Sequence, residues 1–213
     1  MDNVDPAQLE IIDSLIRDGI LTKVNGTMPN SLEGKRCLLV MCGDMNHRRD
    51  VQEFFERKMG AEIHLLKLPG GAVELSPYSP RNRLFPGDFA ARMRDVVRAI
   101  KAQGLNHIIS AGHYRCGSCS LDELDPIGSM LLIKNGKKET IRALTDNYRE
   151  LREAVRGADF WKPSEQDISC FLHCFAGDIL TEHIQQARTA WFISSGLEPW
   201  IMQHHPELMQ LLI

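Results

Sequence analysis

Apolar residues recur along the chain at the spacings of helices and strands. The first such segment spans residues 6–18, where Asp5 and Pro6 are followed by apolar side chains three and four positions apart. This pattern predicts an amphipathic helix that begins at Pro6. A polar, turn-rich connector follows this helix. Because the helix has an apolar face, we expect that face to pack on its own domain or on a neighbouring subunit. We therefore expect an N-terminal helical arm at residues 1–30 and an α/β domain at residues 31–213.

Strand-like and helix-like segments alternate beyond this arm. Three short apolar runs are typical of buried strands, and they span residues 36–42, 61–68 and 107–111. Apolar residues three and four apart predict helices at about 48–59, 88–103 and 139–156, with Asp88 as the N-cap of the second. Two later runs are further strand candidates, of which one could be a buried helix: 168–177 and 189–196. This alternation predicts an α/β fold with a mostly parallel sheet flanked by helices.

Side chains that bind metals follow two of the predicted strands. The first strand ends at Cys42, and the third is followed by His113 and then by Cys116. Because the carboxyl ends of neighbouring parallel strands meet at one edge of a sheet, we expect these three side chains to converge. Two thiolates and an imidazole suit zinc, which prefers four ligands in a tetrahedron. The sequence therefore predicts a Zn²⁺ site, whose fourth position could be taken by Asp44 or by water.

The two motifs resemble those of the β-class carbonic anhydrases. In that family the zinc ligands come from a Cys-x-Asp-x-Arg motif after one strand and a His-x-x-Cys-Gly motif after another. This chain has Cys42-Gly43-Asp44 for the first and His113-Tyr114-Arg115-Cys116-Gly117 for the second, in the same order. The resemblance covers roughly residues 36–120. It implies a β-carbonic-anhydrase-like fold, a bound zinc ion and at least a homodimer, in which the N-terminal arm reaches a neighbouring subunit.

The resemblance also implies an activity, the reversible hydration of CO2 to bicarbonate by a zinc-bound hydroxide. Asp44 would orient this hydroxide, and His47 is the candidate group for carrying the proton away. The family's arginine, two residues after the aspartate, is replaced here by Asn46. Arg48 or another basic residue nearby could supply the missing partner of Asp44. Without such a partner, Asp44 would bind the zinc itself and suppress the activity.

Other functions are compatible with parts of this pattern. The same zinc scaffold could act on a CO2-like molecule such as carbonyl sulfide or carbon disulfide, or could keep zinc without any hydration activity. Cys116 and Cys119 also form a C-x-x-C motif, which is typical of thiol–disulfide redox proteins but leaves Cys42 and His113 without a role. A further group of possible ligands lies in an apolar run, where we expect it to line the core: Cys170, His173 and Cys174.

Composition and charge limit the partners and the cellular location that we expect for this protein. A net charge of −3 gives no electrostatic reason to expect nucleic acid or an anionic membrane as a partner. The resemblance implies a small-molecule substrate, CO2 or bicarbonate. The first residues lack the basic flank and apolar stretch of a signal peptide, and we therefore expect a cytoplasmic protein. We expect its six cysteines to be buried thiols, metal ligands or redox groups and not a disulfide framework. We expect a group of arginines to form a solvated face or a subunit contact: Arg81, Arg83, Arg92, Arg94 and Arg98.

Overall fold

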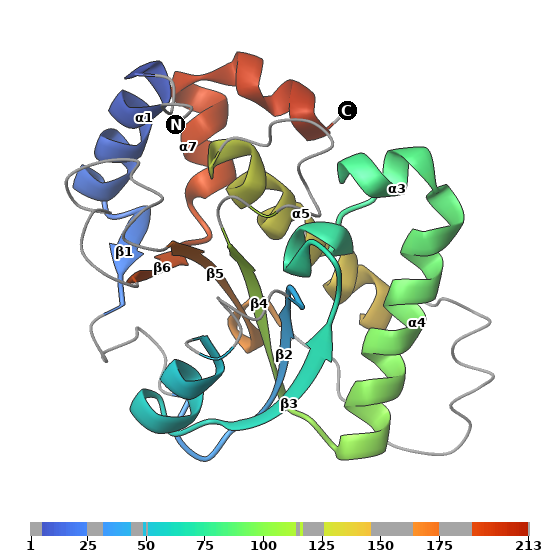
Figure 1. Ribbon diagram of the computed structural model, residues 1–213. Helices are drawn as coiled ribbons and strands as arrows, with labels where there is room; N and C mark the ends of the chain where they lie inside the picture. The colour runs from blue at the N-terminus through green and yellow to red at the C-terminus, as the bar shows by residue number, and fades with distance from the viewer. Residues whose placement is uncertain are drawn as a thin grey trace.

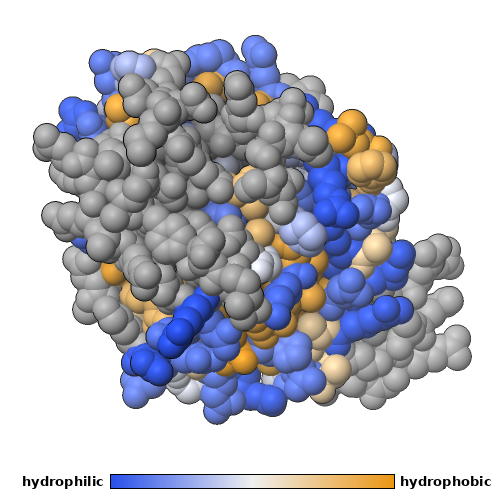
Figure 2. Space-filling model, viewed as in Figure 1, coloured by the Kyte–Doolittle hydropathy of each residue, from blue (hydrophilic) through white to orange (hydrophobic). Residues whose placement is uncertain are grey.

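The computed structural model describes residues 6–24, 32–43, 49, 51–113, 116, 126–145, 164–174 and 189–212. Within them the chain forms an α/β fold, in which helices flank one six-stranded, mostly parallel sheet (Figure 1). The fold class predicted from the alternating pattern is therefore confirmed. No helix of these residues combines the length and the apolarity needed to cross a bilayer. On the face seen in Figure 2, hydrophilic side chains cover much of the described surface, with apolar side chains showing between them.

The sheet has the strand order β1-β6-β5-β4-β2-β3. Its strands are β1 (Leu21–Lys23), β2 (Arg36–Met41), β3 (Glu62–Lys67), β4 (His107–His113), β5 (Ile168–Cys174) and β6 (Thr189–Ile193). The four strands β3, β2, β4 and β5 are parallel, whereas β6 is antiparallel to both of its neighbours. The three predicted strands are confirmed, and both later candidates are strands. The three-residue strand β1 was not predicted, because so short a segment carries no periodic pattern.

The helices differ from the predicted ones mainly where they begin. They are α1 (Pro6–Arg17), α3 (Pro80–Leu84), α4 (Pro86–Gln103), α5 (Pro126–Thr145) and α7 (Leu197–His204). Shorter turns of helix are the π-helical η1 (Phe54–Lys58) and the 3-10 segments η2 (Gly71–Leu75), η4 (Glu165–Asp167) and η5 (Pro206–Leu212). The helix predicted at 139–156 is confirmed over residues 139–145, although α5 begins earlier, at Pro126, and residues 146–156 lie outside the described part of the chain. Asp88 was wrongly taken as an N-cap: Pro86 opens α4, so Asp88 lies in its first turn.

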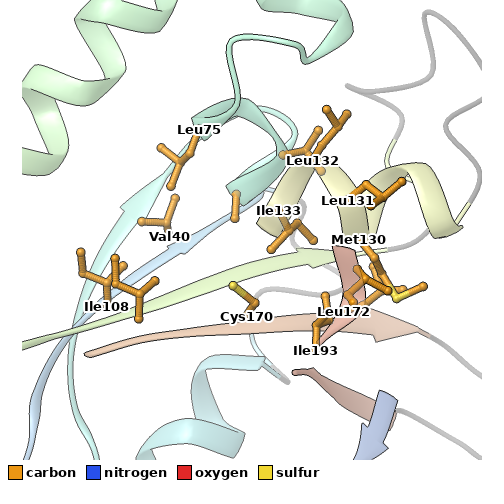
Figure 3. Close-up of a cluster of buried hydrophobic side chains, with 14 of the residues drawn as sticks. Val40, Leu75, Ile108, Met130, Leu131, Leu132, Ile133, Cys170, Leu172 and Ile193 are labelled. Carbon is orange, nitrogen blue, oxygen red and sulfur yellow. The ribbon is translucent and has the colours of Figure 1, made fainter. Parts of the chain in front are cut away.

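Both faces of the sheet are buried, as expected for parallel strands. One apolar cluster joins α1, α4, α5 and α7 to the sheet, and Figure 3 shows side chains of α5 packed against those of the strands. A second cluster lies on the opposite face, where Val51 and Phe55 pack against Phe171 of β5. In α1, Ile12 and Leu15 are buried in the first cluster, so this helix packs on its own domain in the structure. Its expected contact with a neighbouring subunit stays a prediction.

The order of the strands reverses between β2 and β4. From β2 the chain passes to β3 on one side, with Val51 and Phe55 of the connection packed on one face of the sheet. From β3 it passes through α4, which packs on the opposite face, to β4 on the other side of β2. In α/β sheets, ligands bind beyond the carboxyl ends of the strands at such a switch point. The carboxyl ends of β2 and β4 are therefore where the fold itself places a binding site.

Candidate metal centre

Three possible metal ligands meet at this switch point. Cys42 follows β2 directly, His113 is the last residue of β4, and Cys116 lies shortly beyond it. Their ligand atoms all lie within 4.8 Å of one another, and the two sulfur atoms are 3.5 Å apart. All three side chains are buried, with exposed fractions of 4%, 5% and 9%. The structure thus brings together the three side chains that we expected to converge.

The pairing of the strands explains this convergence. β2 and β4 are parallel and paired up to Val40 and Ser110, so both strands reach the same edge of the sheet. Gly112, just before His113, lets α5 approach the end of β4 closely. A Cβ atom on Gly112 would lie 2.7 Å from Cδ1 of Ile133, a separation that real structures do not show. The backbone that carries His113 is therefore held between the sheet and α5.

The segment after β3 closes over the same edge. Gly71 opens η2 with a positive φ of 63°, a conformation that favours glycine. A Cβ atom there would lie 2.8 Å from the carbonyl oxygen of Ala111 and 2.9 Å from the backbone nitrogen of Cys42. The start of η2 therefore rests on the ends of both ligand-bearing strands, and only glycine fits this position without displacing them.

The geometry fits a metal ion better than a disulfide. Two thiolates bound at the usual zinc–sulfur distance in a tetrahedral site lie about 3.8 Å apart, close to the 3.5 Å between Cys42 and Cys116. A disulfide would need about 2.05 Å, so the two sulfur atoms are not bonded to each other. Within the described part of the chain, no other group of three such side chains is this close. The cluster can therefore hold a metal ion.

A buried ion pair joins η2, whose start rests on both ligand-bearing strands, to α4. Glu74 of η2 has no solvent exposure, and its Oε2 is 2.9 Å from Nη1 of Arg92 in α4. Burial raises the pKa of Glu74 above its usual range, the guanidinium of Arg92 opposes that rise, and negative charge on Cys116 adds to it. Glu74 lies three residues after Gly71, at which η2 rests on the ends of both ligand-bearing strands.

Arg92 was wrongly expected on a solvated face, since only 7% of the residue is exposed. It donates hydrogen bonds to Asn82 and to Asp88, one turn earlier in α4. Two signals could have identified the pair. Asp88 and Arg92 have the spacing of a helical ion pair, and Glu74 is the one charged residue in the short run from Gly71 to Leu75.

Several predicted site residues lie outside the described residues: Asp44, Asn46, His47, Arg48 and Cys119. Their roles stay predictions. Cys170 lies in the larger core cluster, as expected, and burial raises the pKa of its thiol. His173 and Cys174 belong to β5, but the description of the structure does not extend to their side chains.

The fold and the cluster define the class of this protein, an α/β protein with a buried Cys–His–Cys group that can hold a metal ion. No protein-family model matches the sequence, and no curated protein matches it either. Any assignment of function therefore depends on the residues of the site.

Proposed function

We propose that this chain binds one zinc ion through Cys42, His113 and Cys116 and acts as a carbonic-anhydrase-like enzyme on CO2. The observation that carries the proposal is the convergence of the three ligand atoms within 4.8 Å of one another. Two thiols and an imidazole are soft and borderline ligands, which favour zinc over the oxygen-preferring ions magnesium and calcium. The resemblance of the two ligand motifs to those of the β-class carbonic anhydrases supplies the reaction.

The resemblance extends the proposal to the fold family and the assembly. A β-carbonic-anhydrase-like fold is supported by the placement of both motifs at the ends of adjacent parallel strands. We further propose a homodimer in which residues 1–30 contribute to the interface. Sedimentation equilibrium tests the assembly, because a chain that stays monomeric at micromolar concentrations would contradict it.

The residues around the cluster suit this chemistry. When bound, zinc lowers the pKa of a coordinated water from 15.7 towards about 7, so that hydroxide is available at neutral pH. Cys42 and Cys116 would release their protons on binding, and the ring of His113 would bind as the neutral form. Side chains of Val73 and Ile133 lie next to Gly112, the neighbour of His113, and such an apolar environment suits a small neutral substrate. Asp44 would accept a hydrogen bond at the site, and His47 would pass a proton to solvent.

Stopped-flow CO2 hydration by the zinc-loaded protein tests the proposed reaction. We expect activity in the wild type and its loss in Cys116→Ser, because the serine hydroxyl is a far weaker zinc ligand than a thiolate. Zinc binding without CO2 hydration would contradict the anhydrase assignment. Hydrolysis of carbonyl sulfide or carbon disulfide by that protein would identify the alternative substrate. Reduction of insulin disulfides by the metal-free protein would instead favour a redox function for Cys116 and Cys119.

A further inference from the structure

Cys42 and Cys116 are the pair whose sulfur atoms lie in contact, among the four cysteine side chains that the structure describes. Their sulfur atoms are 3.5 Å apart, whereas a disulfide holds its two sulfur atoms about 2.05 Å apart. Bond formation therefore requires an approach of about 1.5 Å, which small rotations of the two side chains can supply. The two atoms that would share a metal ion are thus also placed to bond to each other when they are oxidised.

The two cysteines are held differently by the fold. Cys42 directly follows β2, and the start of η2 rests on it, because a Cβ atom on Gly71 would lie 2.9 Å from the backbone nitrogen of Cys42. Cys116 belongs to no strand or helix. We therefore expect the closure to move Cys116 towards Cys42 and to leave the pairing of β2 with β4 unchanged.

The other two described thiols lack a sulfur partner and are less reactive. Cys37 and Cys170 lie in the two core clusters on opposite faces of the sheet, so they cannot bond to each other. Burial raises the pKa of Cys37 to about 12 and also raises the pKa of Cys170. A thiol that stays protonated reacts slowly with oxidants, because the thiolate is the nucleophile. Oxidation should therefore select the pair at the metal centre over these two core thiols.

We propose that peroxide oxidises Cys42 and Cys116 to a disulfide, and that this disulfide prevents metal binding. The metal centre is then a redox-sensitive switch, which holds zinc in the reduced protein and loses it in the oxidised protein. The effect on zinc rests on the metal site of the proposed function. It follows because the thiolate is the form of cysteine that binds metals. After oxidation, His113 is left as the one intact ligand of the three.

The reaction balances with one peroxide molecule for each pair of thiols. The sulfur of Cys116 attacks one oxygen of hydrogen peroxide, the O–O bond breaks, and one water leaves a sulfenic acid behind. The sulfur of Cys42 then attacks that sulfur atom, the S–S bond forms, the S–O bond breaks, and a second water leaves. Two thiols are oxidised by two electrons, and the peroxide is reduced to two waters. In the zinc-loaded protein, solvent supplies the two protons that the thiols released when they bound the metal.

Treatment of the zinc-loaded protein with hydrogen peroxide tests the switch without an activity assay. We expect the protein to lose two of its six thiols and to release its zinc. A thiol reagent in denaturant measures the first change, and a chromophoric chelator measures the second. Mass spectrometry of a digest should identify a peptide pair joined through Cys42 and Cys116. A dithiol reductant should restore both thiols and the binding of zinc.

Variants separate this disulfide from other oxidation products. In the metal-free protein, Cys42→Ser and Cys116→Ser should each fail to give the linked peptide pair, and the remaining cysteine should stop at a sulfenic acid that dimedone traps. Cys37→Ala is the matched control, because it removes a buried thiol outside the cluster. Cys119→Ser removes the competing partner of Cys116. Both of these variants should form the disulfide between Cys42 and Cys116 as the wild type does.

The outcomes separate this inference from the proposed function. A wild type whose thiols and zinc resist peroxide would overturn the switch, and so would a disulfide between Cys116 and Cys119 in place of the expected one. Zinc that stays bound to protein containing the disulfide between Cys42 and Cys116 would overturn its effect on the metal. A wild type that binds no zinc would contradict the proposed function and this effect together. The linked peptide pair in the metal-free protein would still decide whether the two cysteines bond.

Discussion

The sulfur atoms of Cys42 and Cys116 lie 3.5 Å apart, although 74 residues separate the two cysteines in the chain. The parallel pairing of β2 with β4 brings them together at one edge of the sheet. Two thiolates at this distance repel each other, and a shared cation removes that repulsion. Binding of one metal ion by both sulfur atoms is therefore coupled to the release of the thiol protons.

This coupling predicts a pH-dependent affinity for zinc. Binding releases up to two thiol protons, so the apparent affinity should fall by up to about a hundredfold per pH unit as the solution is acidified. Chelator competition between pH 8 and pH 6 measures this slope. An affinity that does not change over this range would show that the thiols are not the ligands.

Gly71 offers a test of the close approach between η2 and the two ligand strands. Gly71→Ala should destabilise the fold by about 1–3 kcal/mol, because the added methyl group meets two backbone atoms and the φ angle is positive. Gly87→Ala is the matched control. Gly87 lies in the first turn of α4, with nothing within 4 Å of the added carbon. Urea denaturation measures both variants, and an equal free energy of unfolding for the two would contradict the close packing.

His107 should make the metal-free protein sensitive to acid. Its Nε2 lies 3.0 Å from the hydroxyl oxygen of Ser169, and burial lowers the pKa of the ring to about 4 from its usual 6.5. Below pH 6.5 the unfolded chain therefore binds a proton that the folded chain does not. Stability is lost as the pH falls from 6.5 towards 4, by at most about 3 kcal/mol.

His107→Gln removes this titration. The free energy of unfolding of the variant should change less between pH 7 and pH 4 than that of the wild type. Urea denaturation of both metal-free proteins at several pH values gives the comparison. Parallel curves for the two proteins would mean that His107 titrates normally in the folded chain.

Lys134 of α5 should make the free energy of unfolding depend on pH in the alkaline range. Burial lowers the pKa of its amine below the usual 10.5, and only 4% of the residue is exposed. The unfolded chain therefore binds more protons than the folded chain between the two pKa values, and stability rises with pH in that interval. Lys134→Met should stabilise the protein at pH 7 by about 1 kcal/mol or more and abolish the rise. Unfolding free energies at pH 7 and at several higher pH values up to 10.5 check both effects, and an unchanged rise in the variant would contradict them.

Lys134 also shows why α5 was hard to find from the sequence. Its buried lysines, Lys134 and Lys137, interrupt the apolar pattern that marks a helix. Gly136 lowers the helix propensity, yet it is needed for packing, because a Cβ atom there would lie 2.9 Å from Cβ of Leu75. Such contacts between distant segments leave no periodic pattern in the sequence from which a helix could be predicted.

The strands and the three ligands were predictable because their signals are local. Cys42 directly follows the apolar run of β2 and His113 ends that of β4. Parallel strands align such ends at one edge of the sheet. For Glu74 and Arg92 the local signals in the sequence give neither their pairing with each other nor their burial. Charged side chains are normally solvated, and this pair depends on how α4 packs against η2.

The zinc content of purified protein tests the central claim most directly. We predict one zinc ion per chain after extensive dialysis of the wild type, and less than about a tenth of that for Cys42→Ala, which loses one of three protein ligands. Cys37→Ala is the matched control, because Cys37 is a buried thiol in the same strand region but outside the cluster. It should keep the zinc. A wild type without zinc, or equal zinc in Cys42→Ala and Cys37→Ala, would contradict the account.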